Sequence, residues 1–126
     1  MWIIPSRSRP QNIQRLVKAF NQTLATSPAL LWLDNDDPFF IEYMAIDYPP
    51  MWQVVSGLRR DGLAEMYNDI FKANPDLDWY GFLADDVVPE TMGWDIAMIR
   101  AAGRSGVAYA DDGINGTELW KSDGTE

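Results

Sequence analysis

The chain has 126 residues, which is enough for one domain and too few for two. Its 19 acidic residues outnumber its 10 Lys and Arg residues, and the net charge of -9 argues against non-specific binding to nucleic acid or to anionic membranes. The sequence has no His and no Cys, which excludes within this chain a Ser-His-Asp triad, a thiol nucleophile, a zinc-thiolate site and a disulfide. A metal held by the remaining oxygen ligands would be a hard cation such as Mg, Mn or Ca.

The first half of the chain alternates apolar runs with helical patterns. Residues 2–4 predict a short strand that stops at Pro5, and apolar residues at helical spacing predict an amphipathic helix from 11 to about 26. The apolar run 30–33 predicts a second strand. Residues 38–50 fit a short helix or a packed loop equally well.

The second half continues this alternation. Its predicted elements are, in order, a strand at 51–55, a helix at about 58–73, a strand at 79–84, a helix at about 90–102 and a strand at 107–110. Alternating strands and helices favour right-handed crossovers and a mostly parallel sheet. We therefore expect one α/β domain over 1–126, a three-layer α/β/α fold, with a loose C-terminal segment from about 113 to 126.

Three of the predicted strands run into acidic residues. Asp34 follows the second strand, Asp85–Asp86 follow the fourth, and Asp111–Asp112 follow the fifth. Ligands of open parallel sheets bind outside the carboxyl ends of the strands. If these strands are parallel, the three acidic clusters lie along one edge, which suggests a divalent cation and a phosphorylated ligand.

Two pairs of arginines lie in segments that could reach a phosphate group. Arg7 and Arg9 lie between the first strand and the first helix, where helix N–H groups favour anions and guanidinium groups suit diphosphates. The alternative is a pair of solvated surface arginines. Arg59 and Arg60 precede the second long helix and could also reach phosphates, although solvated charge is an equal alternative. The loop lacks the glycine spacing of a dinucleotide fingerprint or a P-loop.

The acids after the second strand have two interpretations. In a nucleotide site, Asp34 could accept hydrogen bonds from a ribose hydroxyl or a base N–H group. Alternatively, residues 34–38 form an Asx-rich turn, which we favour for Asp36 and Asp37.

Asp85–Asp86 is the sharpest candidate for chemistry. Adjacent carboxylates repel one another, and a divalent cation would relieve that repulsion while bridging to phosphate oxygens. The alternative is an acidic cluster that complements the dipole of the following helix. Asp111–Asp112 precede Gly113 and fit a common turn, or an acid on the acceptor side of the pocket.

Taken together, these segments resemble the N-terminal, donor-binding half of family-2-like glycosyltransferases of the GT-A fold. Residues 3–10 look like the family's first strand and nucleotide-binding loop, which brings in Pro5 and Ser6 beside the arginines. Residues 62–68 look like its helix that ends in Asn, and residues 82–86 look like its strand with the D-x-D metal motif. The resemblance extends to about residue 112.

The resemblance implies a Rossmann-like GT-A fold that binds a nucleotide-diphosphate sugar with Mn or Mg and transfers the sugar to a hydroxyl acceptor. Asp34 falls where the family recognises the base, and Asp85 and Asp86 fall at the metal. Ala84 stands where many members have the first acid of the motif, so the metal would rest on Asp86, with Asp85 assisting or contacting the ribose.

The family's second half supplies the acceptor site and the catalytic base, and this chain ends at Glu126. The base is then expected to be missing, to come from a homo-oligomer or partner chain, or to be Asp111 or Asp112. A non-catalytic donor-binding module is the main alternative function, followed by a nucleotidyltransferase and a structural protein with Asx turns at its strand ends.

The N-terminus lacks the features of a signal peptide. It has no basic region, and Pro5 follows too soon for an apolar core. No run approaches the 18 apolar residues of a membrane span. A cytoplasmic location is the expectation.

Overall fold

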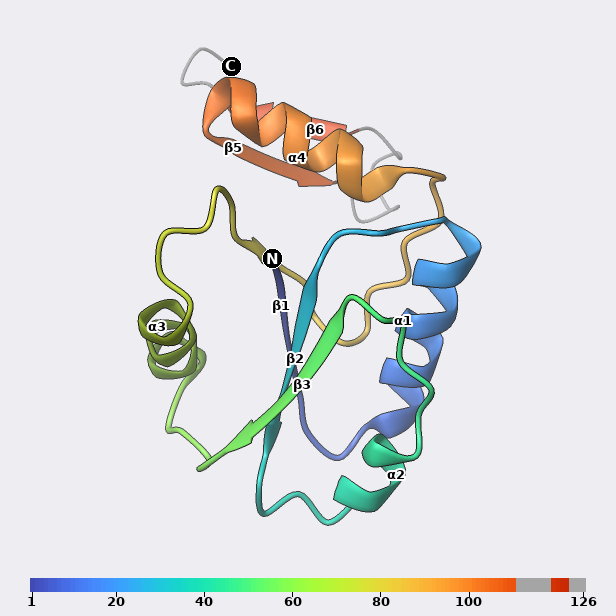
Figure 1. Cartoon of the computed structure of the whole chain (residues 1–126), viewed down its shortest axis with the longest axis vertical. Helices are drawn as coiled ribbons and strands as arrows, with labels where there is room; N and C mark the ends of the chain where they lie inside the picture. Colours follow the sequence, from blue (N-terminus) through green and yellow to red (C-terminus); the bar gives the residue numbers. More distant parts are fainter. Residues whose placement is uncertain (111–118, 123–126) are drawn as a thin grey trace.

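A computed structural model describes residues 1–110 and 119–122. Figure 1 shows a central sheet with helices on both sides and a smaller unit of one helix and two strands at one end. The elements are, in order, β1 Trp2–Ser6, α1 Pro10–Gln22, β2 Ala29–Asp34, α2 Phe40–Met44, β3 Trp52–Gly57, α3 Leu63–Ala73, β4 Gly81–Phe82, α4 Trp94–Ser105, β5 Val107–Ala110 and β6 Leu119–Ser122.

The main sheet has four parallel strands in the order β3-β2-β1-β4. The central strands β1 and β2 are buried on both faces, which explains their continuous apolar sequences. The prediction of a parallel sheet is confirmed for these four strands. Among residues 1–110 and 119–122, no helix is long and apolar enough to cross a membrane.

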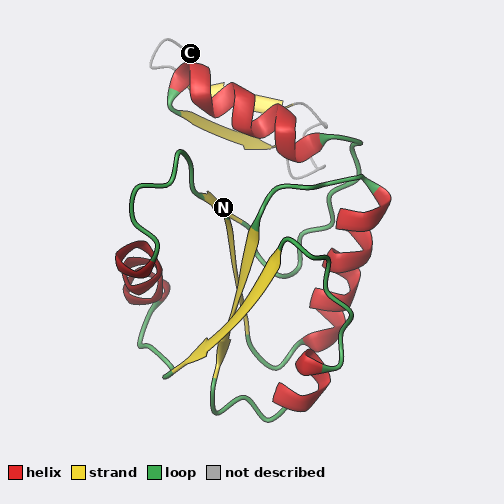
Figure 2. Cartoon of the chain, viewed as in Figure 1, coloured by secondary structure: helices red, strands yellow, loops and turns green. Residues whose placement is uncertain are grey.

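Alternating residues of β1 and β2 enter two different hydrophobic clusters, because successive side chains of a strand point to opposite faces. Ile4 and Leu31 pack with α1 residues such as Phe20. Ile3 and Leu30 pack with α3, whose buried residues are Met66 and Ile70. The helices α1 and α3 therefore cover opposite faces of the sheet, as Figure 2 shows.

The strand β1 continues through Pro5, where the sequence predicted its end. The amide of Leu83 donates to the Ile3 carbonyl, so the odd-numbered residues of β1 direct their backbone polar groups towards β4. Because the pairing with β4 covers only Trp2 and Ile3, the nitrogen of Pro5 faces a side where no ladder hydrogen bond is needed. The pairing with β2 continues to Ser6.

Two predicted elements are shorter in the structure. The strand expected at 79–84 is reduced to Gly81–Phe82, because Trp79 packs against Trp2 and the Tyr80 hydroxyl donates to the Asn74 carbonyl. The helix expected from residue 58 begins at Leu63, since Gly62 has an extended backbone. Residues 58–62 are instead a loop beside the carboxyl end of the sheet.

The expectation that the fifth strand joins the parallel sheet is wrong. β5 pairs antiparallel with β6, a strand that the sequence did not predict, in a separate two-stranded sheet. The helix α4 packs against this hairpin, so the connection from α4 to β5 does not return the chain to the main sheet. The strand β5 therefore does not extend the edge formed by β1, β2 and β4.

Candidate functional site

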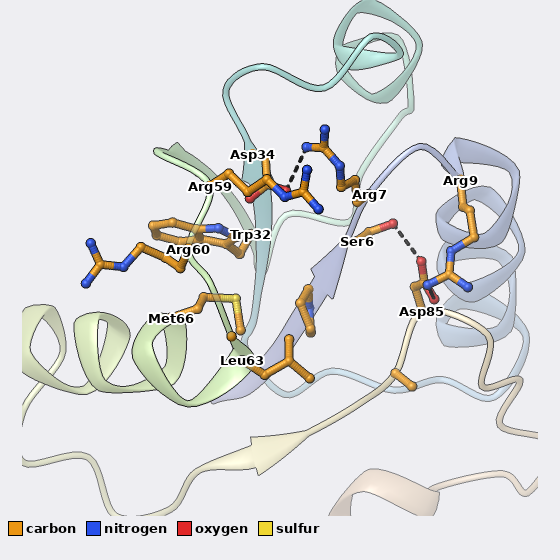
Figure 3. Close-up of a pocket in the computed structure, with 13 residues that line it drawn as sticks. Ser6, Arg7, Arg9, Trp32, Asp34, Arg59, Arg60, Leu63, Met66 and Asp85 are labelled. Carbon is orange, nitrogen blue, oxygen red and sulfur yellow. Dashed lines mark hydrogen bonds and ion pairs between the residues drawn. The ribbon is translucent and has the colours of Figure 1, made fainter.

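A pocket of about 360 Å³ lies at the carboxyl ends of β1 and β2 and beside the first turn of α3 (Figure 3). This is the edge at which ligands of parallel α/β sheets bind. Its lining includes all the residues that were predicted from the sequence to bind a nucleotide sugar: Pro5, Ser6, Arg7, Arg9, Asp34, Arg59 and Asp85. The remaining lining residues are Trp32, Arg60, Gly62, Leu63, Met66 and Ala84.

Asp85 is the most enclosed charge in the pocket, with its side chain only 2% exposed. Its Oδ1 forms an ion pair with Nη2 of Arg9 at 2.9 Å, and its Oδ2 accepts a hydrogen bond from Ser6 Oγ at 2.8 Å. Both carboxylate oxygens therefore have partners, as a buried carboxylate requires.

Tyr43 completes a closed ring of hydrogen bonds around Asp85. Its hydroxyl accepts from the backbone N–H of Arg9 at 2.9 Å and lies 2.7 Å from Ser6 Oγ. Because Ser6 uses its proton for Asp85, the Tyr43 hydroxyl must donate to Ser6. Burial raises the pKa of Tyr43, which keeps this hydroxyl protonated. The ring therefore runs from the Arg9 backbone amide through Tyr43, Ser6 and Asp85 to the Arg9 guanidinium.

Arg7 lies on the other side of the pocket and bridges two acids. Its Nη1 is 2.9 Å from Asp34 Oδ2 and 2.8 Å from Asp36 Oδ1. The hydrogen bonds to Asp36 and Asp34 raise the pKa of Arg7, and the hydrogen bond from Arg7 lowers the pKa of Asp36. The guanidinium is therefore held beside the strand end while it stays one-third exposed.

Asp37 holds the arginine loop in place. Its Oδ1 accepts from the Phe39 amide, which is an Asx turn, and its Oδ2 accepts from the Ser8 amide. Ser8 has a φ of 55°, a left-handed conformation that this contact stabilises. The turn interpretation of Asp37 is confirmed, and the turn orients the loop that carries both arginines.

The opposite wall combines an aromatic face with two further arginines. The Trp32 indole lies at the pocket, and Gly57 leaves the space that it occupies, since a Cβ at residue 57 would lie 2.6 Å from Trp32 Cη2. Arg60 forms ion pairs with Glu65 and Asp69 of α3. Arg59 forms no ion pair with any described residue.

Arginines are concentrated in the lining of this pocket. Four of the ten Lys and Arg residues line it, in a protein of net charge -9. Three of them are ion-paired with acids, so Arg59 and the remaining N–H donors of the other three are the groups that could bind an anionic ligand.

Comparisons with protein-family models, curated proteins and solved structures found no match.

The two carboxylates predicted to bind a metal, Asp85 and Asp86, lie in different environments. Asp85 is enclosed, whereas Asp86 is exposed and does not line the pocket. No group of three or more carboxylates among the described residues is arranged to hold a metal ion. A hard cation takes six or more oxygen ligands, and the oxygens of Asp85 are already bonded to Ser6 and Arg9. Asp85 alone would therefore hold a metal ion in this pocket, with water and phosphate as its other ligands, and the metal assignment stays a prediction.

Sequence reasoning missed Tyr43 and Trp32. Tyr43 falls in the segment 38–50, which has no clear periodic pattern, and Trp32 lies inside the apolar run 30–33, which predicts only a strand. A signal for Trp32 existed, because the residue lies two positions before Asp34 at the end of a strand. Asp111 and Asp112, the candidates for a catalytic base, lie outside the described residues.

Proposed function

We propose that this pocket binds a nucleotide-diphosphate sugar and that the chain is the donor-binding domain of a glycosyltransferase with a GT-A-like fold. The observation that carries the proposal is the gathering of four arginines in one pocket of an acidic chain. Arginine is well suited to diphosphates, because its planar fork donates two parallel hydrogen bonds to phosphate oxygens.

The two walls of the pocket suit the two parts of a nucleotide. Arg7, Arg9 and Arg59 offer donors for the diphosphate, and the Trp32 indole offers a face on which a base stacks. Asp34 lies beside Arg7 at the end of β2, where its carboxylate would accept from a ribose hydroxyl or a base N–H group. The pocket therefore has groups for each part of the ligand except the sugar.

Titration calorimetry with UDP and GDP tests this proposal. We expect one of the two to bind and the corresponding nucleoside to bind much more weakly, because the phosphates supply most of the attraction. Arg59→Met should weaken binding about tenfold or more, since a hydrogen bond to a charged group contributes about 1.5–3 kcal/mol. Arg15→Met is the matched control, because Arg15 is exposed on α1, away from the pocket lining, and its side chain donates to Asn12.

The proposal fails if neither nucleotide binds in the presence or absence of Mn. Equal affinity for the nucleotide and the nucleoside would also contradict it, because the arginines would then have no part in binding.

A non-catalytic binding module is the second candidate. Within the described part of the pocket, each acid is ion-paired, Asp34 with Arg7 and Asp85 with Arg9, so neither carboxylate stands free as a general base. Sugar transfer to a hydroxyl acceptor would then need a partner chain. An assay of UDP-sugar and GDP-sugar turnover by the chain alone separates the candidates, since turnover supports the enzyme and binding without turnover supports the module.

A further inference from the structure

We infer that the pocket binds its diphosphate without a divalent cation, because the guanidinium of Arg9 already supplies positive charge at Asp85. This inference rests on the proposed function and specifies what neutralises the phosphates in that same pocket. It departs from the sequence-based expectation of Mn or Mg at Asp85 and Asp86.

The first argument is the closed ring around Asp85. A cation bound to Oδ1 would lie beside the Arg9 guanidinium and be repelled by its positive charge, and a cation bound to Oδ2 would compete with the Ser6 hydroxyl. Either cation would disturb a ring that also contains the Tyr43 hydroxyl and the Arg9 backbone amide. Buried networks are stable when every member is satisfied, and losing one partner leaves the others with unmet hydrogen bonds.

The second argument is the lack of further ligands for a cation. Asp34 Oδ2 is bonded to Arg7, and Asp86 is exposed outside the pocket. A cation at Asp85 would therefore have to take nearly all its other ligands from water and phosphate.

The third argument is that the Arg9 guanidinium keeps N–H donors for phosphate oxygens while it is paired with Asp85. The side chain is 54% exposed, and within the described residues only its Nη2 forms an ion pair. A guanidinium has five N–H donors, so several remain for phosphate oxygens while the ion pair with Asp85 holds its position. Asp85 thus orients Arg9, and Arg9 offers charged N–H donors to the phosphates at the place where a cation would otherwise lie.

Calorimetric titration of the wild-type chain with UDP and GDP, in EDTA and in excess Mn, tests the inference. We expect dissociation constants that agree within about twofold in the two buffers, a difference of about 0.4 kcal/mol. Binding that is at least tenfold tighter in Mn would overturn the inference while leaving the proposed function intact. Failure of both nucleotides to bind in either buffer would instead overturn the proposed function, and the inference with it.

Two variants distinguish diphosphate binding without a cation from binding through a metal ion at Asp85. Arg9→Met should weaken nucleotide binding in EDTA by about tenfold or more, because it removes a charged donor. Asp85→Asn should retain binding in EDTA, because the loss of a negative charge beside the phosphates offsets the loss of the ion pair that orients Arg9. If the residues instead held a metal, Asp85→Asn would abolish binding and Arg9→Met would strengthen binding in Mn.

Arg15→Met serves as the control for both variants, and circular dichroism with thermal unfolding checks that each variant is folded. Unchanged affinity of folded Arg9→Met in EDTA would contradict the inference. If neither variant folds, the comparison of wild type in EDTA and Mn decides the question alone.

Discussion

Gly57 determines where the Trp32 indole lies in the pocket. The two residues lie on neighbouring strands, and a Cβ on residue 57 would meet Trp32 Cη2 at 2.6 Å, closer than real Cβ atoms approach. Gly57→Ala should therefore displace the indole and weaken UDP or GDP binding by about fivefold or more, since stacking of a base on an aromatic side chain contributes about 1–3 kcal/mol. Calorimetry measures the affinity.

Gly103→Ala is the matched control for Gly57→Ala. A Cβ at residue 103 would meet no atom within 4 Å, and the residue lies inside α4. The control should leave nucleotide affinity unchanged and stabilise the protein by about 0.5–1 kcal/mol, because alanine favours a helix over glycine. Undiminished affinity of Gly57→Ala would show that Trp32 takes no part in binding the nucleoside.

The site residues that the sequence could predict are those at strand ends. Arg7, Asp34 and Asp85 follow apolar runs, and parallel strands bring such positions together whatever the details of packing. The ring around Asp85 could not be predicted, because it depends on Tyr43, which is 37 residues from Ser6 and comes from a segment without a pattern. The pairing of each arginine with an acid likewise depends on side-chain geometry.

At the scale of the elements, Asp95 joins α4 to the connection between α1 and β2. The residue is fully buried in the first turn of α4, and its Oδ2 accepts from the amides of Thr26 and Ser27 and from Ser27 Oγ. Burial raises the pKa of Asp95, but these hydrogen bonds outweigh burial and leave the pKa below its ordinary value of 3.8. The folded state therefore favours the ionised carboxylate.

A carboxylate whose pKa is lowered on folding stabilises the protein above its unfolded pKa, and the stabilisation is lost as the pH falls through the folded pKa. Asp95→Asn should reduce the free energy of unfolding by about 1–3 kcal/mol at pH 7, and the difference from wild type should shrink below about pH 4. Urea unfolding at pH 7 and about pH 3 measures both values. A difference that is the same at both pH values would contradict this role.

The exposed Asp61 offers a control for that measurement. It lies in the loop before α3, and Asp61→Asn should change the free energy of unfolding by no more than about 0.5 kcal/mol at pH 7.

Elements were predictable where the apolar pattern was long and local. α1 and the strands β1, β2 and β3 carry clear periodic or continuous patterns and were found close to their observed positions. β4 is shorter than predicted, and β5 lies at its predicted residues but in another sheet, because an apolar run does not reveal its partner. The aromatic residues before Gly81 serve tertiary contacts, and β5 pairs with β6, whose sequence contains polar residues.

At the scale of the whole molecule, the chain consists of a parallel sheet with two hydrophobic clusters and a smaller α4 unit attached at one end (Figure 1). The attachment includes Asp95 and Trp94, whose indole N–H donates to Thr23 Oγ1. β1 and β2 form the centre of the sheet, and each is hydrogen-bonded to neighbours on both sides. We therefore expect the α4 unit to open more readily than the centre of the sheet.

Hydrogen exchange tests this order of opening. Amides of β1 and β2 should exchange only through global unfolding, whereas amides in the first two turns of α4 should exchange through a partial opening of lower free energy. Asp95→Ala leaves the Thr26 and Ser27 amides without their acceptor and should accelerate exchange in α4 by about tenfold or more, equivalent to about 1.4 kcal/mol. The ratio of exchange rates between α4 and β1 should rise in this variant. If both segments instead lost protection by the same factor, α4 and the sheet would unfold as one cooperative unit, and the polar contacts of Asp95 would stabilise the whole fold and not the attachment alone.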